Sequence, residues 1–467
     1  MFGTFDEKPL GSFHIKTMIV SGIGIFSDAY NLYAIALVYY IASFFLKLNA
    51  LESSLMTSGA FFGAAIGAIM FGVIADRIGR KPMYGIDLAL ITVGAFSQFF
   101  SSDFSWLLIS RIVLGIGIGG DYVLSPVIMA ENSNARDRGK LMVFTFPIMA
   151  AFGAMLAAFV DQVSSMFLAP AEVWRVVLAF GGFPALLIIY FRRKIPETAR
   201  YSARVKGDAT AVEKIEQMTQ SQINIDKDRV KFFKRLRSSL FLVMVSSILW
   251  ILYDMYASTF SIYGPITIAE NLGLTPISFT YYAEVFGGIP GALICAFLID
   301  RVGRRKLIAV GYAGVFIWLL MYSILLIHPA FFGFRYPNGI SPAKLAGDAA
   351  LLGFSFYLLN FLFSAMGPAS IIGGAMITPE LSPTKVRGTS QAITVGFDRI
   401  ANALALTAFP LLLLKFGLST MLLGFSLIAA FSIIVTLMWI PEAKRKTLEE
   451  ISGEINQRFS TAGSGRK

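Results

Sequence analysis

The sequence predicts an all-α membrane protein of about twelve transmembrane helices, arranged as two six-helix bundles. Three observations predict this class. Of the 467 residues, 56% are hydrophobic and only 15% are charged, whereas a soluble protein of this length carries roughly a quarter charged residues. Apolar stretches long enough to cross a bilayer recur along the chain, and three charged motifs repeat once in each half.

Twelve apolar stretches are the predicted spans, because about 20 apolar residues cross the hydrocarbon core. They lie near residues 18–45, 55–75, 84–101, 106–130, 140–160, 174–191, 239–263, 277–299, 307–327, 350–377, 389–414 and 418–440. One long polar segment separates the first six from the last six. We therefore predict an N-terminal bundle over 1–191, a cytoplasmic linker over 192–238, a C-terminal bundle over 239–441 and a cytoplasmic tail over 442–467.

The net charge of +11 does not indicate a nucleic-acid partner, because the basic residues occupy short loops between apolar stretches. Loops rich in Lys and Arg alternate with loops almost free of them. By the positive-inside rule the basic loops and both termini are cytoplasmic, and we expect a multi-pass protein of the cell membrane. A single cysteine, Cys295, and two histidines leave no expected disulfide, metal site or cofactor.

Three short motifs occur in the same order in both halves. They are Asp-Arg-x-Gly-Arg at 76–80 and 300–304, Glu followed seven residues later by Arg-Gly at 131 and 380, and Pro-Glu at 196–197 and 441–442. Parallel repeats of six spans imply two bundles related by an axis along the membrane normal, with the substrate between them.

These motifs resemble those of the major facilitator superfamily over nearly the whole chain. The resemblance implies a transporter whose cytoplasmic charges latch helix ends together in one conformational state. The predicted gating residues are Asp76, Arg77, Arg80, Glu131, Arg138, Asp300, Arg301, Glu380 and Arg387. Ion pairs that break as the halves rock can bias a two-state equilibrium. The alternative is that these charges only anchor the topology.

Charged residues inside predicted spans are costly, so each is a functional hypothesis. Asp28 and Asp121 lie in spans 1 and 4. Burial favours the neutral form of a carboxyl group, so these aspartates are candidates for proton coupling. Arg111 is a further buried charge in span 4, and the alternative to proton coupling is a static ion pair between it and one of the two aspartates.

The second half places Asp254 in span 7 and Arg399, beside Asp398, in span 11. A permanently charged guanidinium suits an anion, which it can bind through two hydrogen bonds. The alternative is that Arg399 pairs with Asp254 or Asp398. Aromatic residues near these charges, including Tyr30, Tyr122 and Trp250, are candidates for lining a substrate cavity.

The segments Ser27-Asp28-Ala29-Tyr30 and Gly120-Asp121-Tyr122 resemble the phosphate:proton symporter branch of the superfamily. The resemblance implies proton movement through the two aspartates and substrate contacts from Tyr122, Trp250 and Asp254, with Arg399 at the position of a lysine. The chain departs from the branch pattern at Met149, where a glutamine is expected, and at Ser258, where a tyrosine is expected. No span 10 asparagine is evident.

We therefore expect a secondary active transporter that works by alternating access, a proton-coupled symporter of a small anion such as phosphate or an organic acid. A proton-coupled sugar transporter, a facilitator without proton coupling and a transporter-like nutrient receptor remain alternatives. No catalytic constellation is present, so an enzyme is not expected. The expected partners are a small-molecule substrate, protons and membrane lipid, with the chain acting as a monomer.

Overall fold

The computed structural model describes residues 2–334 and 345–454, and all regular secondary structure in these residues is helical. Residues 455–467 of the predicted tail lie outside this part of the chain. Ten helical stretches in the described residues are long and apolar enough to cross a membrane. One of them turns back on itself, and a shorter helix, α6, packs beside α7 and α11. The fold of about twelve transmembrane helices in two bundles is confirmed.

The first half comprises one amino-terminal turn, its membrane helices and the linker helices. Their bounds are α1 Gly3–Glu7, α2 Ser12–Leu37, α3 Tyr39–Phe45, α4 Ala50–Ile78, α5 Arg80–Met83, α6 Ile86–Phe99, α7 Phe104–Glu131, α8 Arg138–Val143, η1 Phe144–Ile148, α9 Met149–Phe167, α10 Pro170–Phe180, α11 Gly182–Arg192, α12 Ala199–Tyr201, η2 Ser202–Lys206 and α13 Ala209–Thr219.

The second half repeats the pattern. Its elements are α14 Phe232–Tyr263, η3 Gly264–Ile268, α15 Ala269–Asn271, α16 Pro276–Ala283, η4 Glu284–Gly288, α17 Ile289–Val302, α18 Arg304–Ile327, η5 Pro329–Phe332, α19 Gly347–Met366, η6 Ala369–Gly373, α20 Ile377–Leu381, η7 Thr384–Val386, α21 Arg387–Trp439 and α22 Leu448–Ile451.

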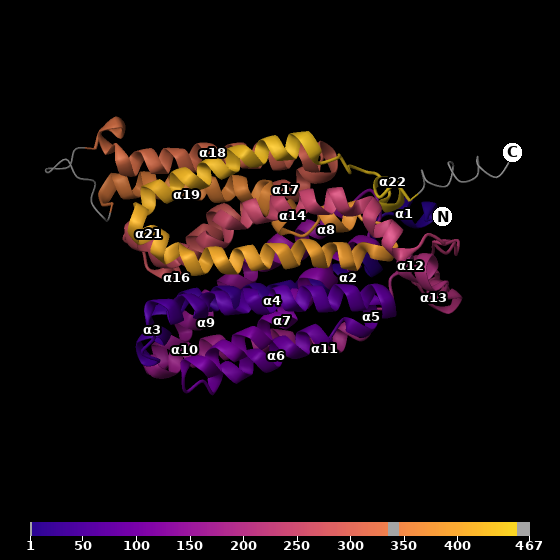
Figure 1. Ribbon diagram of the computed structural model, residues 1–467, viewed down its shortest axis with the longest axis horizontal. Helices are drawn as coiled ribbons and strands as arrows, with labels where there is room; N and C mark the ends of the chain where they lie inside the picture. Colours follow the sequence, from indigo (N-terminus) through magenta and orange to yellow (C-terminus); the bar gives the residue numbers. More distant parts are fainter. Residues whose placement is uncertain (1, 335–344, 455–467) are drawn as a thin grey trace.

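The two halves lie side by side with their helices roughly parallel to the long axis of the molecule (Figure 1). The half formed by α2 to α11 meets the half formed by α14 to α21 mainly where α4 packs against α21, with further contacts of α8 on α17 and of α7 on α21. Substrate pathways in such repeat folds run between the halves, so this interface is where a transport site is expected.

Glycine spacing explains the close packing of α4 on α7. A Cβ at Gly63 or Gly67 would collide with the backbone of Ile112 or Ile116, and Gly115 and Gly119 stand equally close to α4. Each pair is four residues apart and therefore lies on one helix face. Small residues at this spacing let membrane helices approach closely without a hydrophobic driving force, which makes the first bundle a compact unit.

The long helix α21 contains two predicted spans. It bends at Gly417, whose φ of 75° is a backbone conformation that glycine adopts at little cost. The bend falls between the predicted spans 389–414 and 418–440, and the chain visibly reverses direction there (Figure 1). The reversal returns the chain to the end of the molecule where it began.

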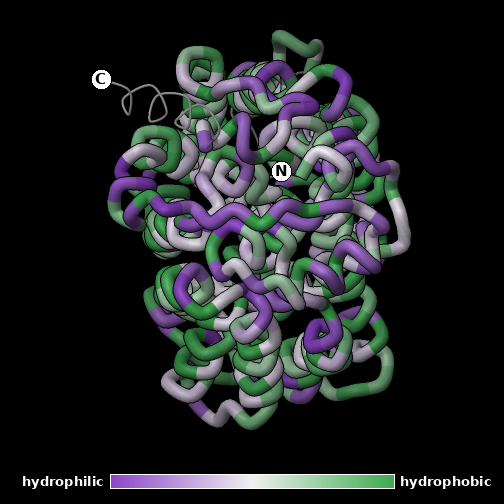
Figure 2. Tube along the Cα trace, turned by 90° about the vertical axis from the view of Figure 1, so that its right-hand side faces the viewer, coloured by the Kyte–Doolittle hydropathy of each residue, from purple (hydrophilic) through white to green (hydrophobic). Residues whose placement is uncertain are grey.

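One end of the molecule, here named the basic end, carries α1, α5, α12, α13 and α22 (Figure 1). Viewed from this end, hydrophilic stretches run across the face of the molecule, over the more hydrophobic helices (Figure 2). Both charged loop motifs lie here, as expected from the repeat. The other end is named the opposite end.

Candidate transport site and gate

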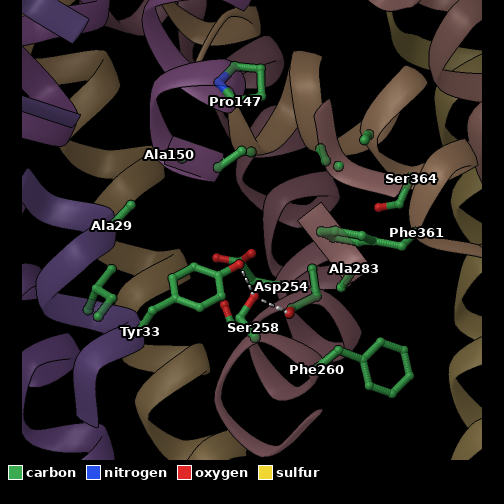
Figure 3. Close-up of a pocket in the computed structure, with 18 of the residues that line it drawn as sticks. Ala29, Tyr33, Pro147, Ala150, Asp254, Ser258, Phe260, Ala283, Phe361 and Ser364 are labelled. Atoms are coloured by element: carbon green, nitrogen blue, oxygen red, sulfur yellow. Dashed lines mark hydrogen bonds between the residues drawn. The ribbon is translucent and has the colours of Figure 1, made fainter. Parts of the chain in front are cut away.

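A cavity of about 170 Å³ lies between the two halves. Aromatic rings make up much of its wall, and side chains from both halves face it (Figure 3). The polar or aromatic lining residues include Tyr33, Phe61, Tyr122, Trp250, Tyr253, Asp254, Tyr256, Ser258, Glu284, Tyr357, Asn360 and Arg399. A concave cavity lined by aromatic side chains with a few polar groups is the usual form of a small-ligand site.

Arg399 is the one arginine or lysine among the described residues that line the cavity. Its Nη1 lies 3.0 Å from Oδ2 of Asp254 and 3.4 Å from Oδ2 of Asp398. The sequence alternative in which Arg399 pairs with these aspartates is therefore the arrangement in this structure. An anion that enters the cavity must share Arg399 with the two carboxyl groups or displace them.

An aromatic ring and the amide of Asn402 also contact the cluster formed by Arg399 and its two aspartates. The Arg399 guanidinium lies over the Tyr122 ring, 4.4 Å from its centroid, a favourable cation–π contact. Asn402 donates hydrogen bonds to Asp254 at 3.0 Å and to Ser258 at 2.7 Å. Tyr122, Trp250, Asp254 and Arg399, all predicted substrate contacts, thus share one wall of the cavity.

Tyr30 does not contribute to this wall, contrary to its predicted substrate contact. Its hydroxyl donates a 2.8 Å hydrogen bond to the carbonyl oxygen of Val177 on α10, and its ring packs on Phe180. The face of α2 that carries Tyr30 turns into the first bundle. Tyr33, one turn further along α2, reaches the cavity instead and contacts Ser261 of the second half at 3.1 Å.

Asn360 on α19 is a lining residue that the sequence analysis missed. It lies in the tenth span, where no asparagine was evident from the motifs. The side chain is 1% exposed, and its Oδ1 has no hydrogen-bond partner within the described part of the chain. A buried carbonyl oxygen without a partner is costly, so Asn360 is available to accept a hydrogen bond from a ligand.

Asp121 is tied into the first bundle by Arg192, the last residue of α11. Arg192 donates to Asp121 Oδ2 at 2.6 Å and to Asp87 Oδ2 at 2.7 Å, and all three side chains are fully buried. The predicted alternative paired an aspartate with Arg111, which is wrong. Arg111 has only a 3.4 Å contact to Gln98 and no acidic partner among the described residues.

Asp28 differs from Asp121 because it has no partner of this kind. It is 0% exposed, and neither carboxyl oxygen has a hydrogen-bond partner in the residues that the structure describes. Asp28 and Asp121 do not line the cavity, and they lie inside the first bundle. Burying an unpaired carboxylate is very unfavourable, so this environment favours a protonated Asp28.

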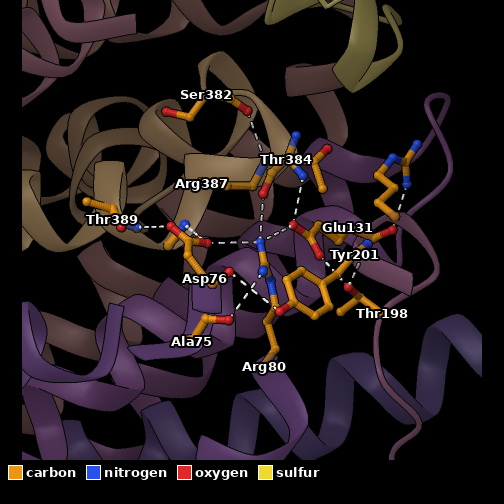
Figure 4. Close-up of polar contacts among 12 residues, drawn as sticks. Ala75, Asp76, Arg80, Glu131, Thr198, Tyr201, Ser382, Thr384, Arg387 and Thr389 are labelled. Atoms are coloured by element: carbon orange, nitrogen blue, oxygen red, sulfur yellow. Dashed lines mark hydrogen bonds and ion pairs between the residues drawn. The ribbon is translucent and has the colours of Figure 1, made fainter. Parts of the chain in front are cut away.

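At the basic end, Asp76 of the first half binds the start of α21 in the second half (Figure 4). Its carboxylate accepts hydrogen bonds from the backbone N–H groups of Gly388 at 3.0 Å and Thr389 at 2.6 Å. The first N–H groups of a helix have no partner within the helix and attract negative charge. Asp76 therefore acts as a cap supplied by the opposite half.

The second repeat makes the reciprocal contact. Asp300 accepts hydrogen bonds from the N–H groups of Gly139 at 3.2 Å and Lys140 at 2.9 Å, at the start of α8. Each half thus caps a helix of the other. The pairing explains why the motifs that contain these aspartates recur once in each half.

Buried ion pairs reinforce both caps. Arg80 lies 3.2 Å from Asp76 and 3.1 Å from Glu131, which also binds Arg387 of the second half at 2.9 Å. The equivalent cluster has Arg304 at 2.8 Å from Glu380, which binds Arg138 of the first half at 2.8 Å. We name these two clusters with their caps the latch, with members Asp76, Arg80, Glu131, Arg387, Asp300, Arg304, Glu380 and Arg138.

Arg77 and Arg301, two of the predicted gating residues, are exposed and form no ion pair within the described residues. Arg304, one helical turn after Asp300, pairs with it in the second repeat as Arg80 pairs with Asp76 in the first. Each motif arginine that follows the glycine points inward, whereas the arginine next to the aspartate points to solvent. The arginine that follows the glycine therefore takes part in the latch, and the arginine next to the aspartate does not.

The two Pro-Glu motifs form an outer layer around the latch. Glu197 accepts from the N–H groups of Arg80 at 3.2 Å and Lys81 at 3.3 Å, and Glu442 accepts from Arg304 and Arg305 in the same way. The preceding residues, Gly79 and Gly303, have φ of 118° and 105°. A Cβ at either glycine would also collide with the glutamate, so both positions require glycine.

Arg200 joins three distant segments beside the latch. It binds Asp6 near the amino terminus at 2.6 Å, Glu449 of α22 at 2.9 Å and the carbonyl oxygen of Glu131 at 2.6 Å. Burial raises the pKa of Asp6 despite the nearby guanidinium. For Glu449, burial acts in the same direction, but Arg200 holds the pKa below its usual value.

Comparison with known proteins identifies the family. The model of the family described as "Sugar (and other) transporter" matches residues 16–454. The chain belongs to this family of membrane transporters. It is 28% identical to a probable inorganic phosphate transporter 1-6 of Arabidopsis thaliana, covering 95% of this chain and 94% of the relative. It is 27% identical to a repressible high-affinity phosphate permease of Neurospora crassa, covering 97% and 88%.

Solved structures show the same fold. The major facilitator superfamily proton:xylose symporter XylE, bound to 6-bromo-6-deoxy-D-glucose, matches with a TM-score of 0.77 at 20% identity, covering 95% of this chain and 99% of that one. The inward-open conformation of the xylose transporter XylE from E. coli gives a TM-score of 0.68 at 19% identity, covering 94% and 99%. These proteins are transporters, and the present chain is a transporter rather than an enzyme.

Proposed function

We propose that this protein is a proton-coupled symporter of a small anion, with inorganic phosphate as the leading substrate. The observation that carries the proposal is Arg399, the single cation of the described cavity wall, which lies between the two halves. A guanidinium is the side chain best suited to bind phosphate or a carboxylate through paired hydrogen bonds. The relatives named as phosphate transporters support phosphate over an organic acid.

Proton coupling is proposed to pass through Asp28 and Asp121. Asp28 is buried without a partner, which suits a group that takes up and releases a proton. Asp121 is held by Arg192, so its protonation would require that pair to loosen. A group whose protonation changes with substrate occupancy can couple a proton gradient to transport.

The latch is proposed to be the gate on the cytoplasmic side. The basic loops at this end favour a cytoplasmic location by the positive-inside rule. We propose that both termini lie in the cytoplasm and that the protein acts in the cell membrane. The hydrogen bonds and ion pairs that join the two halves at this end support a closed latch in this state. We propose that one chain, surrounded by lipid, is the transport unit.

The substrate assignment is tested by exchange of radiolabelled phosphate in proteoliposomes at equal pH on both sides. We expect exchange that excess unlabelled phosphate suppresses and xylose does not, and R399Q should reduce it at least tenfold. Exchange of labelled xylose without exchange of labelled phosphate would replace the anion with a sugar, as in the xylose symporter that shares this fold. Exchange of a labelled di- or tricarboxylate without exchange of labelled phosphate would replace phosphate with an organic acid.

A further inference from the structure

Glu284 is a buried carboxyl group in the cavity wall that neither the latch nor the Arg399 cluster uses. It begins η4 in the eighth span and is 4% exposed. Its carboxyl group forms no hydrogen bond or ion pair with a described residue. Ala283, its neighbour in the chain, and Phe361 both face the cavity (Figure 3).

The surroundings of Glu284 are apolar and aromatic. A Cβ at Gly288 would collide with Oε2 of Glu284 and would lie 3.0 Å from the Phe361 ring. The carboxyl group of Glu284 therefore lies beside Gly288, one turn further along the same span, where the absence of a Cβ leaves room for it. An ionised carboxylate in such a place would lack a countercharge and be shielded from bulk solvent, which is very costly.

The titratable groups on the elements around Glu284 are mainly phenols and carboxyl groups. Tyr357 on α19 and Tyr33 on α2 line the same cavity as Glu284, and phenols stay neutral until about pH 10. The other titratable groups of the elements packed on η4 are Asp348 of α19, Asp161 of α9, Tyr281 and Tyr282 of α16, and Cys295, Asp300 and Arg301 of α17. Asp300 is sixteen residues further along the span, about 24 Å along the helix axis, and none of these groups supplies a nearby cation.

The charge balance of the cavity gives Glu284 a role. Arg399 already shares its charge with Asp254 and Asp398, so a bound anion would face an excess of carboxyl groups unless protons neutralise some of them. Building on the proposed anion symport, we propose that Glu284 is a second proton-binding site, in the C-terminal half. It carries a proton when the anion is bound and releases it on the side where the anion leaves.

The test compares E284Q with the wild type in proteoliposomes, using two readouts. One is the accumulation of labelled phosphate under an imposed inward pH difference with the membrane potential clamped to zero. The other is phosphate counterflow at equal pH. Each coupled proton multiplies accumulation about tenfold per pH unit, the factor that corresponds to one unit of pH. Relative to its own counterflow, E284Q should accumulate about tenfold less phosphate than the wild type for each unit of imposed pH difference.

The matched control is E172Q, which removes an exposed glutamate at the start of α10 and should leave both readouts unchanged. If E284Q accumulates phosphate as the wild type does, relative to counterflow, the second proton site is overturned. If the wild type itself shows counterflow but no accumulation, the proposed proton coupling fails instead, and the two failures are thus distinguishable.

Thermal unfolding supplies a second measurement that does not depend on transport. A glutamine resembles a protonated glutamate in shape and charge, so E284Q should unfold at the wild-type temperature or higher. Failure of E284Q to fold, or a marked drop in its melting temperature, would overturn a protonated Glu284.

Discussion

Asp28 and Asp121 lie in the same bundle, but they have different partners. Asp121 and Asp87 share Arg192 in a fully buried cluster, whereas Asp28 has no hydrogen-bond partner among the described residues. Removing one partner of a buried ion pair leaves an uncompensated charge, which is far more costly than losing a group without a partner. The two sites should therefore respond differently to neutral substitution.

R192Q should destabilise the protein by about 3 to 5 kcal/mol, because two buried carboxylates lose their countercharge. D28N should leave stability unchanged or slightly raised, since an amide resembles the protonated acid. The chain has a single cysteine, Cys295, which is buried, so a thiol-reactive fluorophore reports unfolding without further engineering. Equal melting temperatures for R192Q and D28N would contradict the assignment of Arg192 as the partner of Asp121.

Gly388 shows how closely the halves approach at the latch. A Cβ there would lie 2.9 Å from Asp76 Oδ1 and 2.9 Å from the carbonyl oxygen of Gly72. G388A should therefore push α4 and α21 apart at the basic end and cost about 1 to 3 kcal/mol, the usual range for overpacking. Thermal unfolding followed through Cys295 measures this loss.

G424A is the matched control for G388A. Gly424 lies in the same helix, and nothing lies within 4 Å of a Cβ at that position, so alanine should be neutral or stabilising there. If G388A were as stable as G424A, the close contact between Asp76 and the start of α21 would not exist in the protein.

At the scale of elements, the latch works through helix ends. Asp76 caps α21 and Asp300 caps α8, each across the interface between halves. When the halves separate at this end, four capped N–H groups lose their partners at once, together with the ion pairs of Glu131 and Glu380. The closed state is therefore stabilised by contacts that open together, as a two-state gate requires.

D76N should weaken the cap and increase the time that the basic end spends open. Thr384 is a suitable reporter, because it is 1% exposed, its hydroxyl has no partner among described residues, and its carbonyl oxygen accepts from Arg80. In a C295S background, T384C should be alkylated about tenfold faster with D76N, which corresponds to about 1.4 kcal/mol. An unchanged rate would mean that Asp76 does not hold the gate closed.

Glu380 gives the latch a pH dependence whose direction follows from its neighbours. Burial alone would raise its pKa, but Arg304 and Arg138 hold the pKa below the usual value of 4.5. Its contribution to stability is therefore complete above pH 4.5 and is lost as the pH falls through the lowered pKa. The melting temperatures of the wild type and E380Q should differ by a constant amount above pH 4.5 and converge in acid.

A difference between wild type and E380Q that persisted to pH 2 would contradict an ionised Glu380 in the latch. The corresponding substitution E52Q, at a half-buried glutamate that caps the start of α4, should change stability less than E380Q does above pH 4.5.

At the scale of the whole molecule, the repeat was the most informative feature of the sequence. Hydrophobic spans and doubled motifs predicted two bundles because both follow from local composition and spacing. The residues that the latch brings together come from motifs already evident in the chain, although Arg304 was not among the predicted gating residues and Arg77 and Arg301 face solvent. Which of two arginines in a motif points inward depends on packing, which spacing alone does not reveal.

The cavity was less predictable. Tyr30 follows Asp28 by two residues and seemed suited to substrate, but its side chain turns into the first bundle. The basic run that begins at Arg192 predicts a place in the linker, but Arg192 is the last residue of α11 and is fully buried. Glu284 could have been found, since a glutamate inside the predicted span 277–299 meets the same criterion as Asp28. Asn360 carries no charge and gave no comparable signal.

The central claim is that a proton gradient drives anion transport through the cavity between the two halves. It is tested most directly by measuring labelled phosphate inside proteoliposomes of the wild-type protein under an imposed inward proton gradient. The account predicts an internal concentration that rises above the external one and falls back when a protonophore is added. An internal concentration that reaches the external value and never exceeds it, with or without the protonophore, would contradict proton-coupled symport.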